Sequence, residues 1–253
     1  MKPAIIPRIN HVGFLAGVFI KTMKVIVVSD LHGSLIPIKE KFDLLLMCGD
    51  CEPVWDQSRQ YHKEWLKTDF ANWINNLPYS DEESRVVMIA GNHSFFLEGI
   101  TNKQKGEWLS NINNNRLVYL DNEEYDFVNK GKTYKIFGCP YCKPLYGWPF
   151  CRENYTKYYD FIPNGMDILL LHDAPDIYNG GMSTEGRVAG MNFGNKELAS
   201  YIEKVKPKYC FFGHIHSSPL KKMTEYNGTI LANASILNED YDIAYDPIIF
   251  DMD

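Results

Sequence analysis

The chain has 253 residues, of which 45% are hydrophobic and 23% charged, a composition typical of a globular protein long enough for one large α/β domain. Its formal net charge is −6, from 26 Lys and Arg against 32 Asp and Glu. It contains no basic run of the kind that binds a phosphate backbone. These features argue against a dedicated nucleic-acid-binding protein, and we expect no stable nucleic-acid partner.

The first 22 residues precede the first predicted strand and include an apolar stretch, VGFLAGVFI, at residues 12–20. This stretch is too short to span a membrane, and no clear signal-peptide cleavage site follows it. We expect residues 1–22 to be an N-terminal extension, with Met23 as the natural first residue, and residues 23–253 to form a single domain. We expect no association with a membrane. A secretory signal and an added peripheral strand are the alternatives.

Short apolar runs rich in Val, Ile and Leu recur along the chain. Because their apolarity is continuous rather than alternating, they predict strands buried on both faces of a sheet. In chain order, these strands are predicted at residues 25–28, 44–47, 86–89, 168–171 and 209–212. Amphipathic or helix-favouring segments between them predict helices at residues 60–76 and 195–204.

Turn signals predict two hairpins in addition to these elements. One pairs residues 124–128 with 133–137, and the other pairs 221–226 with 229–233 across the strong turn Asn227-Gly228. A last strand is predicted at residues 247–250. Strand–helix alternation followed by hairpins favours an α/β (α+β) fold in which a sandwich of sheets is flanked by helices.

Each buried strand is followed by polar residues that a hydrophobic core would exclude. Five of the seven histidines fall in these positions. Ligands bind beyond the carboxyl ends of strands in α/β sheets, so five segments direct Asp, Asn and His side chains to one place. In chain order the segments carry Asp30 and His32, Gly49-Asp50, Gly91-Asn92-His93, His172, and Gly213-His214-Ile215-His216.

Carboxylates and imidazoles that share a buried pocket lose solvation unless something compensates them. Divalent cations do so, because imidazole nitrogen and carboxylate oxygen suit Zn, Mn, Fe or Ni, and one carboxylate can bridge two ions. Each motif alone is more often a turn or a surface feature. All five in order, each after an apolar run, predict a metal site.

This ordered pattern, D-x-H, G-D, G-N-H, H and G-H-x-H, resembles that of the calcineurin-like metallophosphoesterase superfamily. The resemblance runs from about Met23 to the end of the chain and implies a four-layer sandwich of two mixed β-sheets flanked by helices. It implies that Asp50 bridges two ions and that His93 is the acid near the leaving group, so that His93, Asn92 and Asp50 are the expected catalytic residues. The implied ligands are Asp30, His32, Asp50 and His216 for the first metal, and Asp50, Asn92, His172 and His214 for the second.

Within the superfamily, the chain is most similar to the metallophosphoesterase-domain-containing, or class III phosphodiesterase, group. The similarity lies in residues 73–78, in Asn233-Ala234-Ser235 and in residues 247–250. It implies that hydroxide activated by two divalent metal ions hydrolyses small phosphodiesters, cyclic nucleotides among them, with manganese as the expected metal and Fe, Zn, Ni or Co as alternatives. Residues 51–55 depart from the usual polar stretch after Asp50, which bears on the substrate pocket. The sequence indicates no oligomeric state.

Other functions remain open on the same motifs. A phosphomonoesterase or a nuclease would use the same ligands, and the aromatic segment 141–159 could stack a base, although a packed loop is the simpler interpretation. A non-catalytic metal-binding scaffold is a further alternative, which the presence of every motif position disfavours.

Six cysteines include two C-x-x-C pairs, Cys48 with Cys51 and Cys139 with Cys142. A redox site or a four-cysteine zinc site is therefore an alternative. Pro144 discourages the helix that usually follows a redox C-x-x-C. We interpret the cysteines as small buried hydrophobic residues in a reducing compartment, and we expect the protein to be cytoplasmic.

Overall fold

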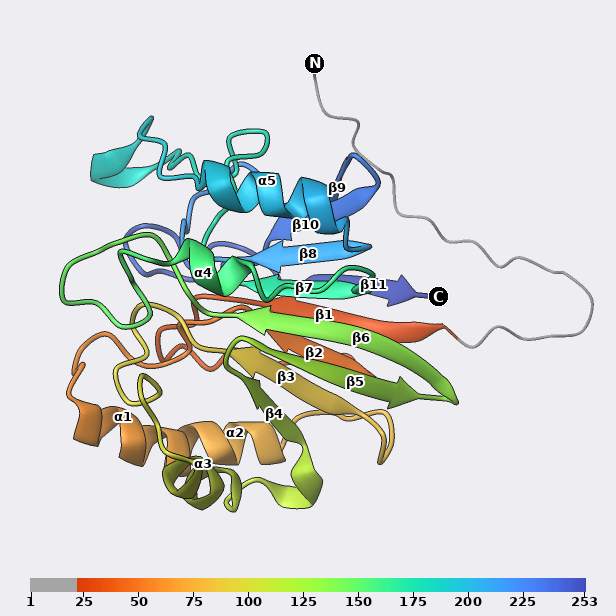
Figure 1. Ribbon diagram of the computed structural model, residues 1–253. Helices are drawn as coiled ribbons and strands as arrows, with labels where there is room; N and C mark the ends of the chain where they lie inside the picture. The colour runs from red at the N-terminus through yellow and green to blue at the C-terminus, as the bar shows by residue number, and fades with distance from the viewer. Residues whose placement is uncertain (1–21) are drawn as a thin grey trace, which may run out of the picture.

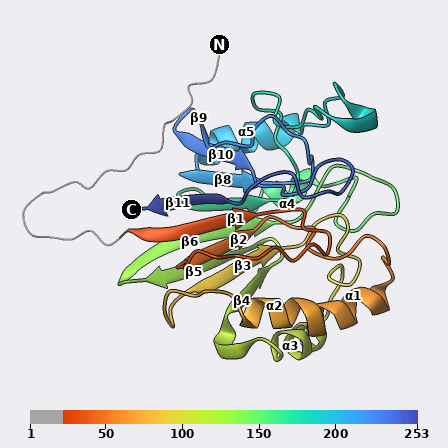
Figure 2. The same ribbon diagram turned by 180° about the vertical axis from the view of Figure 1, so that it is seen from behind.

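The computed structural model describes residues 22–253, so the extension predicted at residues 1–22 lies, except for Thr22, outside the described residues. Two mixed β-sheets pack face to face and are flanked by helices on their outer faces (Figures 1 and 2). This arrangement confirms the predicted four-layer sandwich. Within residues 22–253, no helix combines the length and apolarity that a membrane crossing requires.

The first sheet has the strand order β11-β1-β2-β3-β4. Strands β1 to β4 run parallel, because each is connected to the next by a crossover, whereas β11 pairs antiparallel with β1. The strands predicted from continuous apolar runs are confirmed within two residues at their ends. The bounds are β1 Met23–Val28, β2 Leu44–Met47, β3 Arg85–Ile89, β4 Leu117–Leu120 and β11 Ile248–Met252.

The second sheet has the order β5-β6-β7-β8-β10-β9. Both predicted hairpins are confirmed. The first turns at Lys130-Gly131 and the second at Asn227-Gly228, where all four residues have positive φ. The strands are β5 Glu123–Asn129, β6 Lys132–Cys139, β7 Ile168–Leu171, β8 Tyr209–Phe212, β9 Thr224–Tyr226 and β10 Thr229–Asn233.

Helices cover both outer faces of the sandwich (Figure 1). The helix predicted at residues 60–76 consists of α1 Arg59–Trp65, a π-helical turn Leu66–Phe70, and α2 Ala71–Asn75. The helix predicted at 195–204 is α5 Lys196–Val205, whose N-cap Asn195 accepts a hydrogen bond from the backbone N–H of Leu198. Two further helices were not predicted, α3 Asn102–Leu109 and α4 Thr156–Tyr159.

Three hydrophobic layers hold the sandwich together. The central layer, between the sheets, contains Val25, Ile89, Ile136 and Phe211. One outer layer packs α1, α2 and α3 on the first sheet, and the other packs α4 and α5 on the second. Strands buried on both faces explain why their sequences are apolar without alternation. The carboxyl ends of the parallel strands lie at one edge of the molecule. These strands are β1, β2 and β3 in the first sheet and β7 and β8 in the second.

Candidate metal centre

The structure brings all eight predicted site residues together at the carboxyl ends of the strands. The loops after β1, β2 and β3 come from the first sheet, and those after β7 and β8 come from the second. The hydrogen bonds and close contacts described below connect every member to at least one other. The eight residues are Asp30, His32, Asp50, Asn92, His93, His172, His214 and His216.

A first donor group consists of Asp30, His32 and His216, whose donor atoms all lie within 4.8 Å of one another. The Nε2 atoms of His32 and His216 are 3.1 Å apart, and Asp30 Oδ1 lies 3.6 Å from His216 Nε2. Two imidazole nitrogens that face each other at this distance, beside a carboxylate, form the donor geometry that a shared cation satisfies. His32 also shares a donor group with Asp50 and His93.

A second donor group lies around Asn92. Its Oδ1 is 3.0 Å from His172 Nε2 and 2.8 Å from His214 Nδ1, and His172 Nε2 is 3.1 Å from Asp50 Oδ2. Asp30, Asp50 and His172 form a further set within 4.8 Å, which connects the two groups. Asp50 thus lies between them, in the position that the resemblance implied for a bridging carboxylate.

The backbone at the site adopts conformations that L-residues rarely occupy. Asp30, His32, Asp50 and His214 have φ values of 53°, 43°, 50° and 68°. Left-handed backbone at non-glycine residues costs on the order of 1 kcal/mol each and persists where a functional constraint fixes it. Four such residues in one site indicate that the donor positions, rather than local stability, determined these loops.

Glycine permits the close approach of two of these loops to the donors. A Cβ at Gly91 would lie 2.3 Å from Asp50 Oδ1, and a Cβ at Gly213 would lie 2.2 Å from Asp30 Oδ2. Neither contact is sterically possible, because real Cβ atoms do not approach other heavy atoms so closely. The glycines of the G-N-H and G-H-x-H motifs are therefore required by the packing of carboxylates against the backbone.

Surrounding groups orient the donors. The carbonyl of Cys48 lies 2.8 Å from His172 Nδ1, and the carbonyl of Asn238 lies 2.9 Å from His216 Nδ1. Since a carbonyl only accepts hydrogen bonds, each Nδ1 carries a proton, and Nε2 is the ring nitrogen that remains to bind a cation. Asp30 Oδ2 accepts a 2.7 Å hydrogen bond from Ser235 Oγ.

Burial and neighbouring charges determine the protonation states of the donor side chains. Burial lowers the pKa of His32 to about 3, so its imidazole is neutral at pH 7. Burial also opposes the charged forms of Asp50 and His172, but their mutual attraction outweighs it, holding the pKa of Asp50 below its usual range and raising that of His172 to about 10. In the metal-free protein, the positive charge of protonated His172 therefore compensates the negative charge of Asp50. A bound cation would replace that proton.

The donor set fits two divalent cations. It combines two carboxylates, an amide oxygen and four imidazoles, and His32 Nδ1 is a buried polar atom without a hydrogen-bond partner among the described residues. Donors of this type are those that Zn, Mn, Fe, Co and Ni prefer. These donors form positions for two ions, but they do not identify which metal binds.

A cavity of about 110 Å³ opens beside these donors. His93 lines it, and His93 Nδ1 lies 3.0 Å from the side-chain amide nitrogen of Gln57. The indole of Trp148 packs edge-on to the His93 ring at 4.4 Å between centroids. The full lining is Asp50, Asn92, His93, His214, His216, Glu239 and Tyr241.

Gln57, Glu239 and Tyr241 lie at the site but were not predicted from the sequence. All three lie in loops, which have no periodic pattern, so no sequence signal marked them. A larger cavity, of about 530 Å³, lies between α1, α2 and two loops, the one after β1 with Gly33 and the one after β2 with Trp55. It contains none of the predicted donors, so we place the chemistry at the smaller, polar cavity.

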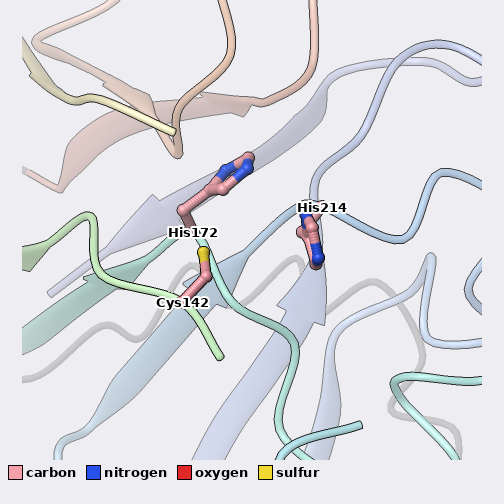
Figure 3. Close-up of side chains that lie close together, drawn as sticks. All are labelled: Cys142, His172 and His214. Atoms are coloured by element: carbon pink, nitrogen blue, oxygen red, sulfur yellow. The ribbon is translucent and has the colours of Figure 1, made fainter. Parts of the chain in front are cut away.

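In the aromatic segment 141–159, Phe150 and Tyr159 are buried in hydrophobic clusters, whereas Tyr146 is fully exposed. All six cysteines are free thiols. Among residues 22–253, the donor groups close enough to share a cation include a single cysteine, Cys142, so the four-cysteine zinc alternative has no site there. Cys142 lies beside His172 and His214 (Figure 3).

Residues 23–218 match the family described as calcineurin-like phosphoesterase. The chain is 29% identical over 248 residues to a UPF0046 protein of Caenorhabditis elegans, covering 93% of this chain and 83% of the relative. It is 25% identical over 247 residues to human metallophosphoesterase domain-containing protein 1, covering 89% of this chain and 69% of the relative.

Solved structures show a similar fold. The phosphopantetheinyl hydrolase of Mycobacterium tuberculosis superposes with a TM-score of 0.50 at 12% identity, covering 86% of this chain and 90% of the other. The fold, the order of the motifs and the match over most of the described residues agree with one another. The chain belongs to the calcineurin-like phosphoesterase family.

Proposed function

We propose that this protein hydrolyses small phosphodiesters at a centre of two divalent cations. One observation carries the proposal: seven donor side chains from both sheets converge beside a small polar cavity that also contains His93. Two bound cations of this kind lower the pKa of water and offset charge on phosphoryl oxygens. Family membership supports phosphoester chemistry, and the preference for diesters is our own inference.

The ligand side chains and His93 have different tasks in this proposal. Asp30, His32, Asp50 and His216 hold one cation, and Asp50, Asn92, His172 and His214 hold the other. His93 donates a proton to the leaving alkoxide, a step worth about 10²–10⁴-fold in rate. The side-chain amide of Gln57 lies 3.0 Å from His93 Nδ1 and orients the ring, so that in the imidazolium form Nε2 is the nitrogen that gives up the proton.

Glu239 supports the preference for diesters. Its side chain lines the cavity, and its Oε1 is held by the backbone N–H of Ser217 at 3.1 Å, by Ser217 Oγ at 2.7 Å and by Ser183 Oγ at 3.3 Å. A fixed carboxylate at this position repels a phosphomonoester dianion more strongly than a diester, which has one negative charge. One additional unit charge at several ångströms shifts binding by about 1–3 kcal/mol at an effective dielectric constant of about 20.

The test compares bis-p-nitrophenyl phosphate, p-nitrophenyl phosphate and cyclic nucleotides as substrates, with Mn, Zn and Co and with chelator. We expect cleavage that requires metal and a higher kcat/KM for the diester than for the monoester. Glu239→Gln keeps the hydrogen-bond acceptor and removes the charge, so we expect the ratio of diester to monoester kcat/KM to fall about tenfold. Glu124→Gln, on the exposed face of β5, is the matched control and should leave this ratio unchanged.

The two parts of the proposal fail separately. If protein loaded with two metals cleaves none of these esters, the enzymatic proposal is wrong. If it prefers the monoester, the site is that of a phosphomonoesterase. If the diester is preferred and Glu239→Gln leaves the ratio unchanged, Glu239 has no part in the choice of substrate.

A further inference from the structure

Cys142 lies against the second donor group. Its sulfur, one nitrogen of His172 and one nitrogen of His214 all lie within 4.8 Å of one another. Figure 3 shows the three side chains coming from separate segments, the loop after β6, the loop after β7 and the loop after β8. Ligands of one tetrahedral or octahedral ion, at about 2.0–2.3 Å from it, lie within such distances of each other.

The backbone fixes the position of this sulfur. The N–H of Cys142 donates to the carbonyl of Phe150 at 3.0 Å, and the N–H of Arg152 donates to the carbonyl of Cys142 at 3.3 Å. These bonds form a short parallel bridge between Cys142 and Cys151. The Cys142 side chain is 1% exposed, so it cannot turn away into solvent.

The Cys142 thiol has two weak hydrogen-bonding partners, of which one is the thiol of Cys151. The Cys142 sulfur lies 3.5 Å from the carbonyl of Pro140, a weak hydrogen bond. A thiol that coordinates a cation releases its proton to solvent, and a cation bound at this position would give the buried sulfur a charged partner.

We propose that Cys142 is a sulfur ligand of the second metal position and makes that position select zinc or cobalt over manganese. The inference rests on the metal centre of the proposed function. Thiolate is a soft ligand that favours Zn over the harder Mn, whereas the first position has only carboxylate and imidazole donors. Manganese, the metal that the resemblance implied, is then restricted to the first position.

Cobalt provides a spectroscopic test that does not depend on turnover. Metal-free full-length protein is loaded with two equivalents of Co²⁺, and its near-ultraviolet spectrum is recorded for sulfur-to-cobalt charge transfer. We expect the band in the wild type and its loss in Cys142→Ser. Cys151→Ser is the matched control, because Cys151 is the bridged neighbour and belongs to none of the donor groups; it should retain the band.

Competition between metals gives a second measurement. At equal Zn²⁺ and Mn²⁺, the wild type should retain zinc in one position, and Cys142→Ser should lower the zinc-to-manganese ratio at least tenfold. X-ray absorption of the zinc-loaded wild type should show a sulfur neighbour at about 2.3 Å and needs no folded variant. The inference is overturned if two bound ions give no sulfur signal, or if the signal survives in Cys142→Ser or disappears in Cys151→Ser. Diester cleavage by the same sample reports separately on the proposed function.

Discussion

Glu52 is a carboxyl group buried directly behind the metal ligands. Ser94 Oγ donates to its Oε2 at 2.8 Å and the Cys51 thiol at 3.4 Å, while Oε1 has no partner among the described residues. Burial raises the pKa of Glu52 from 4.5 to about 7. Between about pH 4.5 and 7, Glu52 is therefore protonated in the folded protein and ionised in the unfolded chain.

This difference makes stability depend on pH. Because the native state binds more protons in that window, the free energy of unfolding falls as pH rises from about 4.5 to 7, by about 3 kcal/mol from this group. Glu52→Gln removes the charge but keeps a similar shape. We expect the variant to be more stable than the wild type at pH 8 and to lose most of this advantage at pH 4.5.

Guanidinium denaturation of metal-free protein at the two pH values measures the effect. The exposed Glu124→Gln is the control, and its stability relative to wild type should not change with pH. A constant difference between Glu52→Gln and the wild type at both pH values would show that Glu52 does not titrate as proposed.

The loop between β2 and α1, residues 48–58, contributes a residue to the site near each of its ends. Its first residues carry Asp50, and Gln57 near its end reaches His93. Ser58 then ends the loop as the N-cap of α1, since its side chain accepts from the backbone N–H of Tyr61. The start of α1 therefore fixes the residue that orients the acid.

We expect Gln57→Ala to slow cleavage of diesters with poor leaving groups, such as alkyl esters, about tenfold. Cleavage of p-nitrophenyl esters should change little, because p-nitrophenolate leaves without a proton. His93→Ala should show the same dependence on the leaving group with a larger loss, and both variants should keep two metals. Rates for a series of leaving groups, with metal analysis, measure this.

Gln60→Ala provides the control, since Gln60 is an exposed residue of α1 whose side chain donates a hydrogen bond to Glu64. In the double variant Gln57→Ala/His93→Ala, the loss of Gln57 should have no further effect. Additive losses, or an equal loss for all leaving groups, would mean that Gln57 acts through the fold rather than through His93.

Strands and ligands could be predicted from the sequence for a shared reason. A strand buried on both faces is a continuous apolar run, and the polar residues that end it stand out, as at Val28 and Asp30. Helix α3 was missed because its sequence NKQKGEWL is scarcely amphipathic and contains Gly106. Strand β4 was missed because Leu117–Leu120 is only four residues long and follows an Asn-rich turn.

Contacts between distant loops could not be predicted. Tertiary packing brings Glu239 to the cavity and Gln57 to His93, and one sequence does not encode such packing in any periodic pattern. Cys142 was noted as part of a C-x-x-C pair and interpreted as a small buried residue, and its position beside His172 and His214 depends on packing that the spacing does not encode.

The metal centre joins the two sheets of the molecule. Its donors come from the loops of β1, β2 and β3 in the first sheet, and of β7 and β8 in the second. Cations held by these donors would therefore connect the halves of the sandwich, in addition to the hydrophobic layer between them. An ion that binds only the native state stabilises it by about 2.7 kcal/mol at 100 times its dissociation constant.

Removal of metal should consequently lower the melting temperature of the whole protein. A loss of about 3–5 kcal/mol corresponds to a decrease of about 6–20 °C for a chain of this size. Differential scanning calorimetry with chelator and with Zn²⁺ or Mn²⁺ tests this. Asp50→Asn removes the bridging carboxylate, so its melting temperature should respond far less to metal. Equal melting temperatures with and without chelator in the wild type would show that no native-state metal site exists.

The pairing of β11 with β1 determines when the first sheet can be completed. β1 has the apolar sequence MKVIVV, and its outer neighbour is the last strand of the chain, Ile248–Met252. During translation, one edge of β1 therefore stays unpaired until all the other strands of both sheets have been made, and an open apolar edge is a template for aggregation. Loss of residues 248–252, through a premature stop codon or a protease, would leave that edge open while every other strand is present.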